Sequence, residues 1–393
     1  MKDDIDSIEK VNQWLVTPRP AIFQGQDLRE LDADISGKIS EDCVFLGCEI
    51  GPLLGQAIAK KNCSIIHRPK LAFNPFKSSL YSPEELYDYY DVDKPLSYMN
   101  CLDRKIYCSY VDCTIPEIRD NERPELQVDL NEALMRRIHD WSISDALHEL
   151  IPEENRPHTV AIMGGHDVGR DEGAYKDTVN LAHSLAKSGF FVITGGGPGL
   201  MEAANMGSYL SGFNDGIKKL DDLIKMLSNA SLYNHKDWLQ WGFKAKEMLG
   251  IPDDLSASKN LGIPTWFYGH EPPNVFATDI AKYFENSVRE EGLLAIAWGG
   301  IIFAKGNGGT VQEIFQDANQ NYYRLFGKRK SPMVLFGVDF WNPLPDGPII
   351  AKQKPVYPLL LALAKEKDFS EMIMLSDSSE EILNFIRSKK DQH

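Results

Sequence analysis

The sequence FFVITGGGPGLMEAA, residues 190–204, decides the fold of the larger part of this chain. Its apolar start predicts a buried strand, its glycines predict a tight turn, and Pro198 is suited to the first position of the helix that follows. The sequence GGIIFAKGNGGTVQE, residues 299–313, repeats this order of strand, glycine turn and helix. Because such turns expose backbone N–H groups at the start of a helix, the pair predicts an anion-binding site.

Strands and helices alternate around these two stretches. Further strands are predicted at TVAIMGG (159–165), IPTWFY (263–268), PMVLFGV (332–338) and EMIMLSD (371–377). An amphipathic helix is predicted at residues 171–189, and Gly189 ends it. Such alternation is typical of a parallel sheet with helices on both faces. We therefore expect a doubly wound, Rossmann-like α/β domain at residues 156–393, with its ligand beyond the carboxyl ends of the strands.

The sequence before residue 156 does not show this alternation of strands and helices. Residues 1–120 contain short β-like pieces and many prolines, which predict a smaller, irregular α+β accessory domain. Within it, DCVFLGCEI (42–50) is interpreted as one rung of a β stack. Residues 121–155 are expected to be bridging helices, because apolar residues recur at helical spacing between residues 130 and 151. Residues 212–261 are a predicted helical insert of the large domain, and its aromatic residues Trp238, Trp241 and Phe243 are expected to be packing residues.

The composition limits the possible partners. The chain has 393 residues, a formal net charge of −15 and a pI near 5.1. Nucleic acids and anionic membranes require a basic face, so this charge argues against both as partners. No stretch reaches the roughly 20 apolar residues of a membrane span, and the acidic start MKDDIDSIEK lacks an apolar signal core, so we expect a cytoplasmic protein. The six cysteines match no standard zinc spacing and are interpreted as buried free thiols, with no metal expected.

Neither glycine turn fits the two best-known phosphate-binding motifs. The turn at residues 195–199 lacks the third glycine of the dinucleotide fingerprint at its required position. Neither turn contains the Gly-Lys-Ser/Thr ending of a P-loop. These differences disfavour a nicotinamide-dependent dehydrogenase and a phosphate-transferring ATPase.

Three motifs resemble those of the LOG (Lonely Guy) phosphoribohydrolases. GGGPGLMEAA (195–204) resembles their GGGxxGLM motif, KGNGGTVQE (305–313) is similar to PGGxGTxxE, and VAIMGGHDVGRDEGAY (160–175) resembles their opening strand and loop. The resemblance covers about residues 159–377, and the front part looks like the extra region of a longer bacterial LOG-like subgroup. It implies cleavage of the N-glycosidic bond of a nucleoside 5′-monophosphate, without a metal or an organic cofactor, by a protein that is commonly a homodimer.

The resemblance also implies roles for individual residues. Glu313 matches the final glutamate of the PGGxGTxxE motif, where a carboxylate would stabilise the positive charge that develops on the ribose. Arg289 matches the family's arginine before this motif with a shift of one residue, although it could instead be a helix-surface arginine paired with Glu285. The residues expected to bind nucleotide and phosphate are Gly164, Gly165, His166, Asp167, Gly195, Gly196, Gly197, Gly199, Leu200, Met201, Gly306, Asn307, Gly308, Gly309 and Thr310.

The PGGxGTxxE motif departs from the family pattern at three positions. Lys305 replaces the proline and could attract phosphate. Asn307 replaces a glycine, and asparagine tolerates the left-handed backbone that glycine would otherwise provide. Gln312 replaces a glutamate that could bind ribose hydroxyls, so this change bears on the substrate or the activity rather than on the fold.

Three histidines are weaker candidates for the site. His166 follows a predicted strand and could contact the base or phosphate, or could instead stabilise its loop. His270 also follows a predicted strand and is a candidate for a role in the site, while His139, next to Asp140, is interpreted as a buried and satisfied residue. Three functions stay open from the sequence. They are a nucleoside monophosphate hydrolase, a non-catalytic nucleotide-binding or sensing module, and a glycosidase that acts on a modified or cyclic nucleotide.

Overall fold

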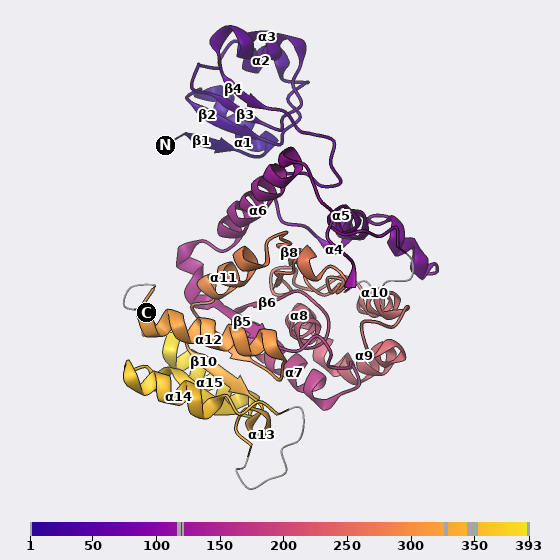
Figure 1. Cartoon of the computed structure of the whole chain (residues 1–393), viewed down its shortest axis with the longest axis vertical. Coiled ribbons are helices and arrows are strands. Elements are labelled where there is room, and N and C mark those ends of the chain that lie inside the picture. The colour runs from indigo at the N-terminus through magenta and orange to yellow at the C-terminus, as the bar shows by residue number, and fades with distance from the viewer. Residues whose placement is uncertain (1, 116–118, 120–121, 326–328, 344–352, 391–393) are drawn as a thin grey trace. The chain divides into compact units, whose positions relative to one another are not determined.

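A computed structural model describes residues 2–115, 119, 122–325, 329–343 and 353–390, which form two compact units (Figure 1). The small unit comprises Met1–Leu80, Ser109–Asp112 and Pro124–Leu150. The large unit comprises Tyr81–Cys108, Cys113–Arg123 and Ile151–His393. Residues 81–108 therefore belong to the large unit, although they precede the predicted bridging helices. The predicted division into domains at residues 120 and 155 stays a prediction.

The small unit contains a four-stranded parallel sheet in the order β1-β2-β3-β4. Its elements are β1 (Asp3–Ile5), α1 (Ile8–Val16), β2 (Ala21–Gln24), α2 (Asp32–Ser36), β3 (Val44–Leu46), α3 (Pro52–Lys61) and β4 (Ser64–Ile66). A helix connects each strand to the next, so the unit is more regular than the sequence predicts. The regularity is hidden because each strand has only three or four residues, too few to show an alternating pattern.

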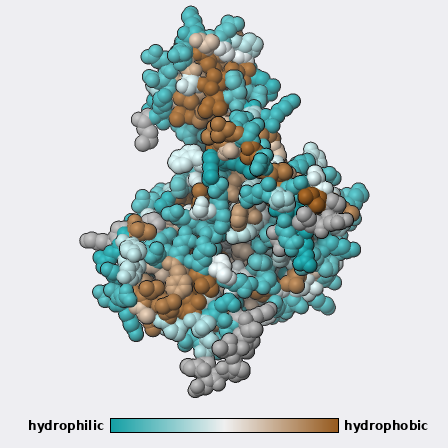
Figure 2. All heavy atoms as spheres, in the orientation of Figure 1, coloured by the Kyte–Doolittle hydropathy of each residue, from teal (hydrophilic) through white to brown (hydrophobic). Residues whose placement is uncertain are grey.

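The small sheet has one buried face and one half-buried face. Phe23 of β2 and Phe45 of β3 are paired in the sheet, and their rings stack with centroids 4.9 Å apart on the buried face. The opposite face carries the half-buried residues Ile22, Val44 and Leu46, and hydrophobic residues gather over these strands in Figure 2. The core of this unit therefore lies on the phenylalanine side of the sheet.

The predicted helix between residues 130 and 151 is observed as α6 (Leu130–Leu150), which belongs to the small unit. His139 of this helix is fully buried, and its Nδ1 lies 3.1 Å from Oδ1 of Asp140. Its ring also packs edge-on against Phe73. The interpretation of His139 as a buried and satisfied residue is confirmed.

The large unit contains a seven-stranded parallel sheet in the order β11-β10-β9-β5-β6-β7-β8. The strands are β5 (Thr159–Met163), β6 (Phe191–Thr194), β7 (Leu261–Gly262), β8 (Asp279–Ile280), β9 (Gly300–Phe303), β10 (Met333–Phe336) and β11 (Ile373–Ser376). The main connecting helices are α7 (Gly173–Lys187), α8 (Leu200–Leu210), α11 (Asn286–Ile296), α12 (Gly308–Tyr323), α14 (Tyr357–Glu366) and α15 (Ser379–Lys390). Every residue of β5, β9 and β10 is buried, as expected for a sheet covered on both faces. The Rossmann-like α/β fold is confirmed.

The order of the strands reverses at β5. The chain first adds β6, β7 and β8 on one side of β5, and then adds β9, β10 and β11 on the other side. In open sheets of this kind, a crevice forms beyond the carboxyl ends of the strands at the point of reversal. The turns that follow β5 and β9 therefore flank the expected ligand site.

Two local predictions are wrong. The stretch IPTWFY (263–268) is not a strand, because β7 ends at Gly262 and residues 266–268 form a short 3-10 helix capped by the Thr265 hydroxyl. This stretch is apolar because Trp266 is fully buried. Buried strands and buried short helices both need apolar residues, so the sequence alone does not distinguish them here. Pro198 is not in the first turn of α8 either, since the helix begins at Leu200, after Gly199 with a φ of 66°.

The insert before β7 contains two α-helices, α9 (Leu220–Leu227) and α10 (Trp238–Leu249). Trp238 is buried, and Trp241 and Phe243 are partly buried against the main core of the large unit. Their predicted role in packing is confirmed.

The segment before β5 contributes α4 (Pro83–Leu86) and α5 (Leu102–Tyr110). Cys108 and Cys113 form a disulfide, which corrects the expectation of six free thiols. The other four cysteines are free and buried, as predicted. In the part of the chain that the structure describes, no helix combines the length and apolarity needed to cross a membrane.

Candidate active site beyond the central strands

A cavity of about 240 Å³ lies where the glycine turns of the large unit meet. It is lined by Met163, Gly164, Gly165, His166, Met201, Tyr268, Glu271, Arg289, Glu290, Asn307, Gly309, Thr310 and Glu313. These residues come from the end of β5 and the turn after it, from the turn after β9, from α8, α11 and α12, and from the segment between β7 and β8. The cavity thus occupies the position that the reversal of strand order predicts.

The turn from β9 into α12 presents the start of a helix to this cavity. The helix begins at Gly308, and the side chain of its N-cap residue, Asn307, makes no hydrogen bond to the first turn. Asn307 has a φ of −98°, so the left-handed backbone expected there is not adopted, and its side chain instead donates to Oδ2 of Asp167 at 3.1 Å. A Cβ at Gly306 would lie 2.1 Å from Oγ1 of Thr310, so this turn needs glycine for space. The amide groups of the first helical turn remain available to an anion.

The turn after β5 is tied to the turn after β9. The N–H of Gly165 donates to the carbonyl of Lys305 at 2.8 Å. A Cβ at Gly165 would lie 2.9 Å from Oδ1 of Asp167, and a Cβ at Gly164 would lie 2.8 Å from Cβ of Leu200. A side chain at Gly164 would therefore clash with Leu200, whereas one at Gly165 would displace the end of the Asp167 side chain. Lys305 lines a neighbouring cavity, and its attraction of phosphate stays a prediction.

The triple-glycine turn after β6 lies behind Arg289. A Cβ at Gly195 would lie 3.2 Å from Nη2 of Arg289, so the guanidinium packs directly on this turn. The N–H of Leu200, at the start of α8, donates to the carbonyl of Gly165 at 3.0 Å, and Gly199 also packs against that carbonyl. The start of α8 is therefore occupied by the turn after β5. Direct contact of this turn with phosphate stays a prediction.

Arg289 forms the polar centre of the cavity. Its Nη1 lies 3.4 Å from Oε1 of Glu313, and its Nε donates to the carbonyl of Ile263 at 2.9 Å. Only 8% of Arg289 is exposed, so the alternative of a helix-surface arginine is wrong. The structure thus brings together the two side chains that the resemblance nominates for catalysis.

A second carboxylate, Glu290, lies near the same nitrogen of Arg289. Its Oε1 is 3.9 Å from Nη1 of Arg289. Two amide side chains hold this carboxylate, because Asn286 donates to Oε1 at 2.7 Å and Gln312 donates to Oε2 at 2.9 Å. Gln312, which replaces a glutamate of the family motif, therefore orients a carboxylate that comes from α11.

Burial sets the protonation of Glu313. Removal from water raises the pKa of Glu313 to about 7, the positive charge of Arg289 opposes this rise, and the negative charge of Glu290 adds to it. A carboxyl group with a pKa near neutrality exchanges protons readily at physiological pH. Such perturbed carboxyl groups in cavities are typical of catalytic sites, although structural carboxyl groups also show them.

A third carboxyl group that lines the cavity is Glu271. Its Oε1 is 3.5 Å from Nδ1 of His166 and 3.7 Å from Nε2 of His270. Burial raises the pKa of Glu271, and the nearby charges of His166 and Arg289 oppose that rise. His166 also packs edge-on against Tyr233 of the insert, with ring centroids 5.5 Å apart.

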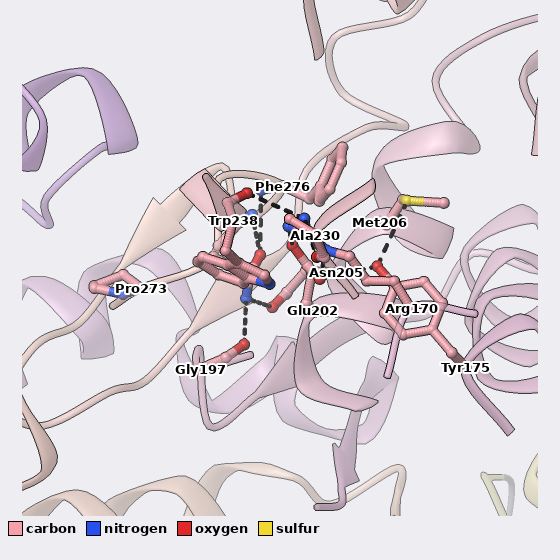
Figure 3. A network of polar contacts seen from close by, with 12 residues as sticks. Arg170, Tyr175, Gly197, Glu202, Asn205, Met206, Ala230, Trp238, Pro273 and Phe276 are labelled. Carbon is pink, nitrogen blue, oxygen red and sulfur yellow. Dashed lines mark hydrogen bonds and ion pairs between the residues drawn. The ribbon is translucent and has the colours of Figure 1, made fainter. Parts of the chain in front are cut away.

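A buried ion pair connects the turn after β5 to α8 and to the insert (Figure 3). Arg170 donates to both carboxylate oxygens of Glu202, from Nε at 2.8 Å and from Nη2 at 2.5 Å. Nη1 of Arg170 donates to the carbonyls of Ala230 and Trp238, and the hydroxyl of Tyr175 donates to Glu202. Because both charges are almost fully buried, either residue without its partner would leave an uncompensated charge.

A buried asparagine holds the triple-glycine turn in shape. Nδ2 of Asn274 lies 3.1 Å from the carbonyls of both Gly196 and Gly197, and 2.8 Å from Oδ1 of Asn205. Gly196 has a φ of 73°, a conformation that favours glycine. Asn274 therefore fixes the wall of the cavity against which Arg289 packs.

The structure brings many of the predicted site residues to this one cavity. The lining includes Gly164, Gly165, His166, Met201, Arg289, Asn307, Gly309, Thr310 and Glu313. The others lie in the same turns or at the starts of their helices without being among the lining residues, namely Asp167, Gly195, Gly196, Gly197, Gly199, Leu200, Gly306 and Gly308. The roles of all these residues stay predictions.

Sequence reasoning missed Glu271, Glu290, Tyr268 and Met163 as lining residues. Glu290 directly follows the predicted Arg289, and Glu271 directly follows the candidate His270, so their positions in the sequence were a weak signal. Nothing in the sequence shows that α11 and the segment after β7 face the start of α12. Those contacts depend on the packing of the sheet.

Comparison with known proteins supports the sequence resemblance in part. Residues 157–219 match the model of the SLOG cluster4 family. This stretch spans β5 to α8 and thus two of the glycine turns, whereas Arg289 and Glu313 lie outside it. The SLOG superfamily includes LOG-like proteins, and the match points to a nucleotide-related function. A search of curated proteins found no match.

Proposed function

We propose that the chain hydrolyses the N-glycosidic bond of a nucleoside 5′-monophosphate and releases the free base and ribose 5-phosphate. The observation that carries this proposal is the contact of Arg289 with Glu313 at 3.4 Å, inside a cavity that also receives the start of α12. A phosphate at the start of that helix would have its ribose close to Glu313, which lies about one helical turn further along.

The proposed reaction needs a carboxylate beside the anomeric carbon. As the bond from C1′ to the base nitrogen breaks, positive charge develops on C1′ and the ring oxygen, and ionised Glu313 stabilises that charge. A water oxygen then bonds to C1′, and Glu313 accepts a proton from that water. The positive charge of Arg289 favours the ionised form of Glu313, and the contact of Nη1 of Arg289 with Oε1 of Glu313 holds the carboxylate in place.

The remaining lining fits the other parts of such a substrate. The side chains of Met163, Met201 and Tyr268 provide an apolar surface for a planar base. Glu290, held by two amide side chains, can accept hydrogen bonds from the ribose hydroxyls. The expected homodimer is part of this proposal only through the resemblance to LOG proteins.

A second candidate function is nucleotide binding without turnover, as in a sensor. It is favoured by the burial of Glu313, because a pKa of about 7 leaves a large fraction of this carboxyl protonated near neutral pH. It is also favoured by Gln312, which replaces a carboxylate of the family motif. In a sensor, the same turns would hold the nucleotide and the small unit would transmit its presence.

The test is incubation of the purified full chain with a panel of nucleoside 5′-monophosphates, with free base measured by chromatography. We expect base release, and we expect Glu313→Gln to lower kcat by about 10²-fold or more, because it removes the charge that stabilises the transition state. Asp317→Asn is the matched control. Asp317 is a buried carboxyl one turn further along α12 that does not line the cavity, and its Oδ1 accepts a hydrogen bond from Ser331 at 2.6 Å.

The outcomes separate the two candidate functions. Loss of turnover in Glu313→Gln, with near-normal turnover in Asp317→Asn, supports the hydrolase. Nucleotide binding without base release, unchanged in Glu313→Gln, supports the sensor. Base release at the normal rate by Glu313→Gln contradicts the assigned role of this residue.

A further inference from the structure

Glu271 is a buried carboxyl group of the cavity that the reaction described above does not use. Its side chain is 14% exposed and lies within 4 Å of two histidine rings, those of His166 and His270. A Cβ at Gly197 would lie 3.6 Å from Oε2 of Glu271 and 2.9 Å from Cε of Met201. Glu271 and Met201 therefore border the same part of the cavity, and Met201 offers an apolar surface to a planar base.

Glu271 and Glu313 both line the cavity, together with Arg289. Nη1 of Arg289 contacts Glu313, whereas Nη2 packs on the triple-glycine turn at Gly195. The same turn borders Glu271 two residues later, at Gly197. Two carboxyl groups that flank a scissile bond commonly divide the work, one stabilising charge or activating water and the other donating a proton to the leaving group.

Hydrolysis of a nucleotide needs such a proton donor, because most bases are poor leaving groups as anions. A side chain that protonates the leaving nitrogen in the transition state accelerates such a reaction by about 10²–10⁴-fold. Glu271 is suited to this task, since burial raises the pKa of its carboxyl and favours the protonated form. The charged groups around it are His166, Arg289, Asp167 and Lys282, and His270 lies next to it.

His166 connects Glu271 to the solvent. Its side chain is 39% exposed, and its Nδ1 faces Oε1 of Glu271 at 3.5 Å. A histidine in this position can carry a proton from bulk water to a buried carboxylate. The arrangement therefore contains both a proton donor and a route for its renewal.

We propose that Glu271 is the general acid of the hydrolysis, an inference that rests on the proposed function. Glu271 donates its proton to a ring nitrogen of the base as the bond to C1′ breaks, and the electron pair of that bond stays with the base. Water adds to C1′ and passes its proton to Glu313. The base leaves as a neutral molecule, Glu313 releases its proton to solvent, and a proton returns to Glu271 through His166.

The test compares two leaving groups in the wild type and in Glu271→Gln. One substrate is a purine nucleoside 5′-monophosphate, and the other is p-nitrophenyl β-D-riboside 5-phosphate, whose p-nitrophenolate departs without a proton. We expect Glu271→Gln to lower kcat for the purine nucleotide by about 10²-fold or more and to leave kcat for the p-nitrophenyl substrate within about three-fold of the wild type. Glu313→Gln should impair both substrates, because both pass through the same charged ribose.

Other outcomes overturn the inference. Equal losses on both substrates would mean that Glu271 supports the structure of the cavity, and no loss on either would mean that it has no part in the reaction. Thermal unfolding and ribose 5-phosphate binding of Glu271→Gln show whether the variant folds and keeps its cavity. If the wild type releases neither base nor p-nitrophenolate, the proposed function itself fails, and that result is distinct from a failure of the assignment of Glu271.

Discussion

Replacement of Glu313 by glutamine should stabilise the protein at alkaline pH while it abolishes turnover. In the folded chain the pKa of Glu313 is raised from 4.5 to about 7, chiefly because the carboxyl is buried. A group whose folded pKa is raised contributes stability that is fully present below its unfolded pKa and is lost as the pH rises through its folded pKa. The pH window for Glu313 therefore runs from about 4.5 to somewhat above 7.

The size of the effect follows from the difference between the two pKa values. Each unit of pKa corresponds to about 1.4 kcal/mol, so full ionisation of buried Glu313 costs about 3 kcal/mol of unfolding free energy. Glutamine carries no charge at any pH and avoids this loss. Relative to the wild type, Glu313→Gln should be near neutral in stability at about pH 5 and more stable by about 2–3 kcal/mol at about pH 8.5.

Urea unfolding followed by tryptophan fluorescence measures this difference across the pH range. Five of the seven tryptophans, Trp238, Trp241, Trp266, Trp298 and Trp341, lie in the large unit and report mainly on it. Burial also raises the pKa of Asp317 to about 7, so Asp317→Asn should weaken the pH dependence in a similar way while turnover persists. If the stability difference between Glu313→Gln and the wild type is the same at pH 5 and pH 8.5, Glu313 is not a buried carboxyl with a raised pKa.

Three further substitutions test how the cavity is built. Gly195→Ala should lower kcat about ten-fold or more, because its Cβ would lie 2.7 Å from Sδ of Met201 and 3.2 Å from Nη2 of Arg289 and would shift both side chains; steady-state kinetics measures this, and unchanged kcat would contradict it. Arg170→Met should lower the free energy of unfolding, measured in urea, by about 3–5 kcal/mol, because it leaves the carboxylate of Glu202 buried without its partner. A decrease below about 1 kcal/mol would be inconsistent with the buried ion pair. Asn274→Ala should lower the free energy of unfolding by about 1–3 kcal/mol and also slow turnover, because two carbonyls of the triple-glycine turn lose a side-chain donor. Normal kinetics in this variant would show that activity does not depend on the shape of the turn.

The strands around the site could be predicted because their signal is local. β5, β6, β9 and β10 are short apolar runs that end at or near glycines, and nearly all of their residues are buried in the sheet. In contrast, β7 and β8 have only two residues each, and the strands of the small unit have three or four, so no periodic pattern could develop. The short 3-10 helix at residues 266–268 was mistaken for a strand because burial of Trp266 produces the same apolar run.

Some properties of the site follow from residue type and order along the chain. At glycines 164–165, 195–197 and 306, another backbone segment or side chain lies close to where a Cβ would be, and such tight turns between strand and helix have a recognisable sequence. The alternation of strands and helices likewise places these turns at one edge of a parallel sheet. The amino-acid sequence was sufficient to predict these turns and their place in the fold, because each feature depends on a few neighbouring residues.

Other properties depend on distances that only the folded chain defines. The contacts of Arg289 with Glu313, of Gln312 with Glu290 and of His166 with Glu271 each join segments that are separate in the sequence. The raised pKa values of Glu271 and Glu313 arise from burial, which no single stretch of sequence specifies. Electrostatic energy varies with separation and exposure to water, so the chemistry of this cavity was decided when the sheet and its helices packed together.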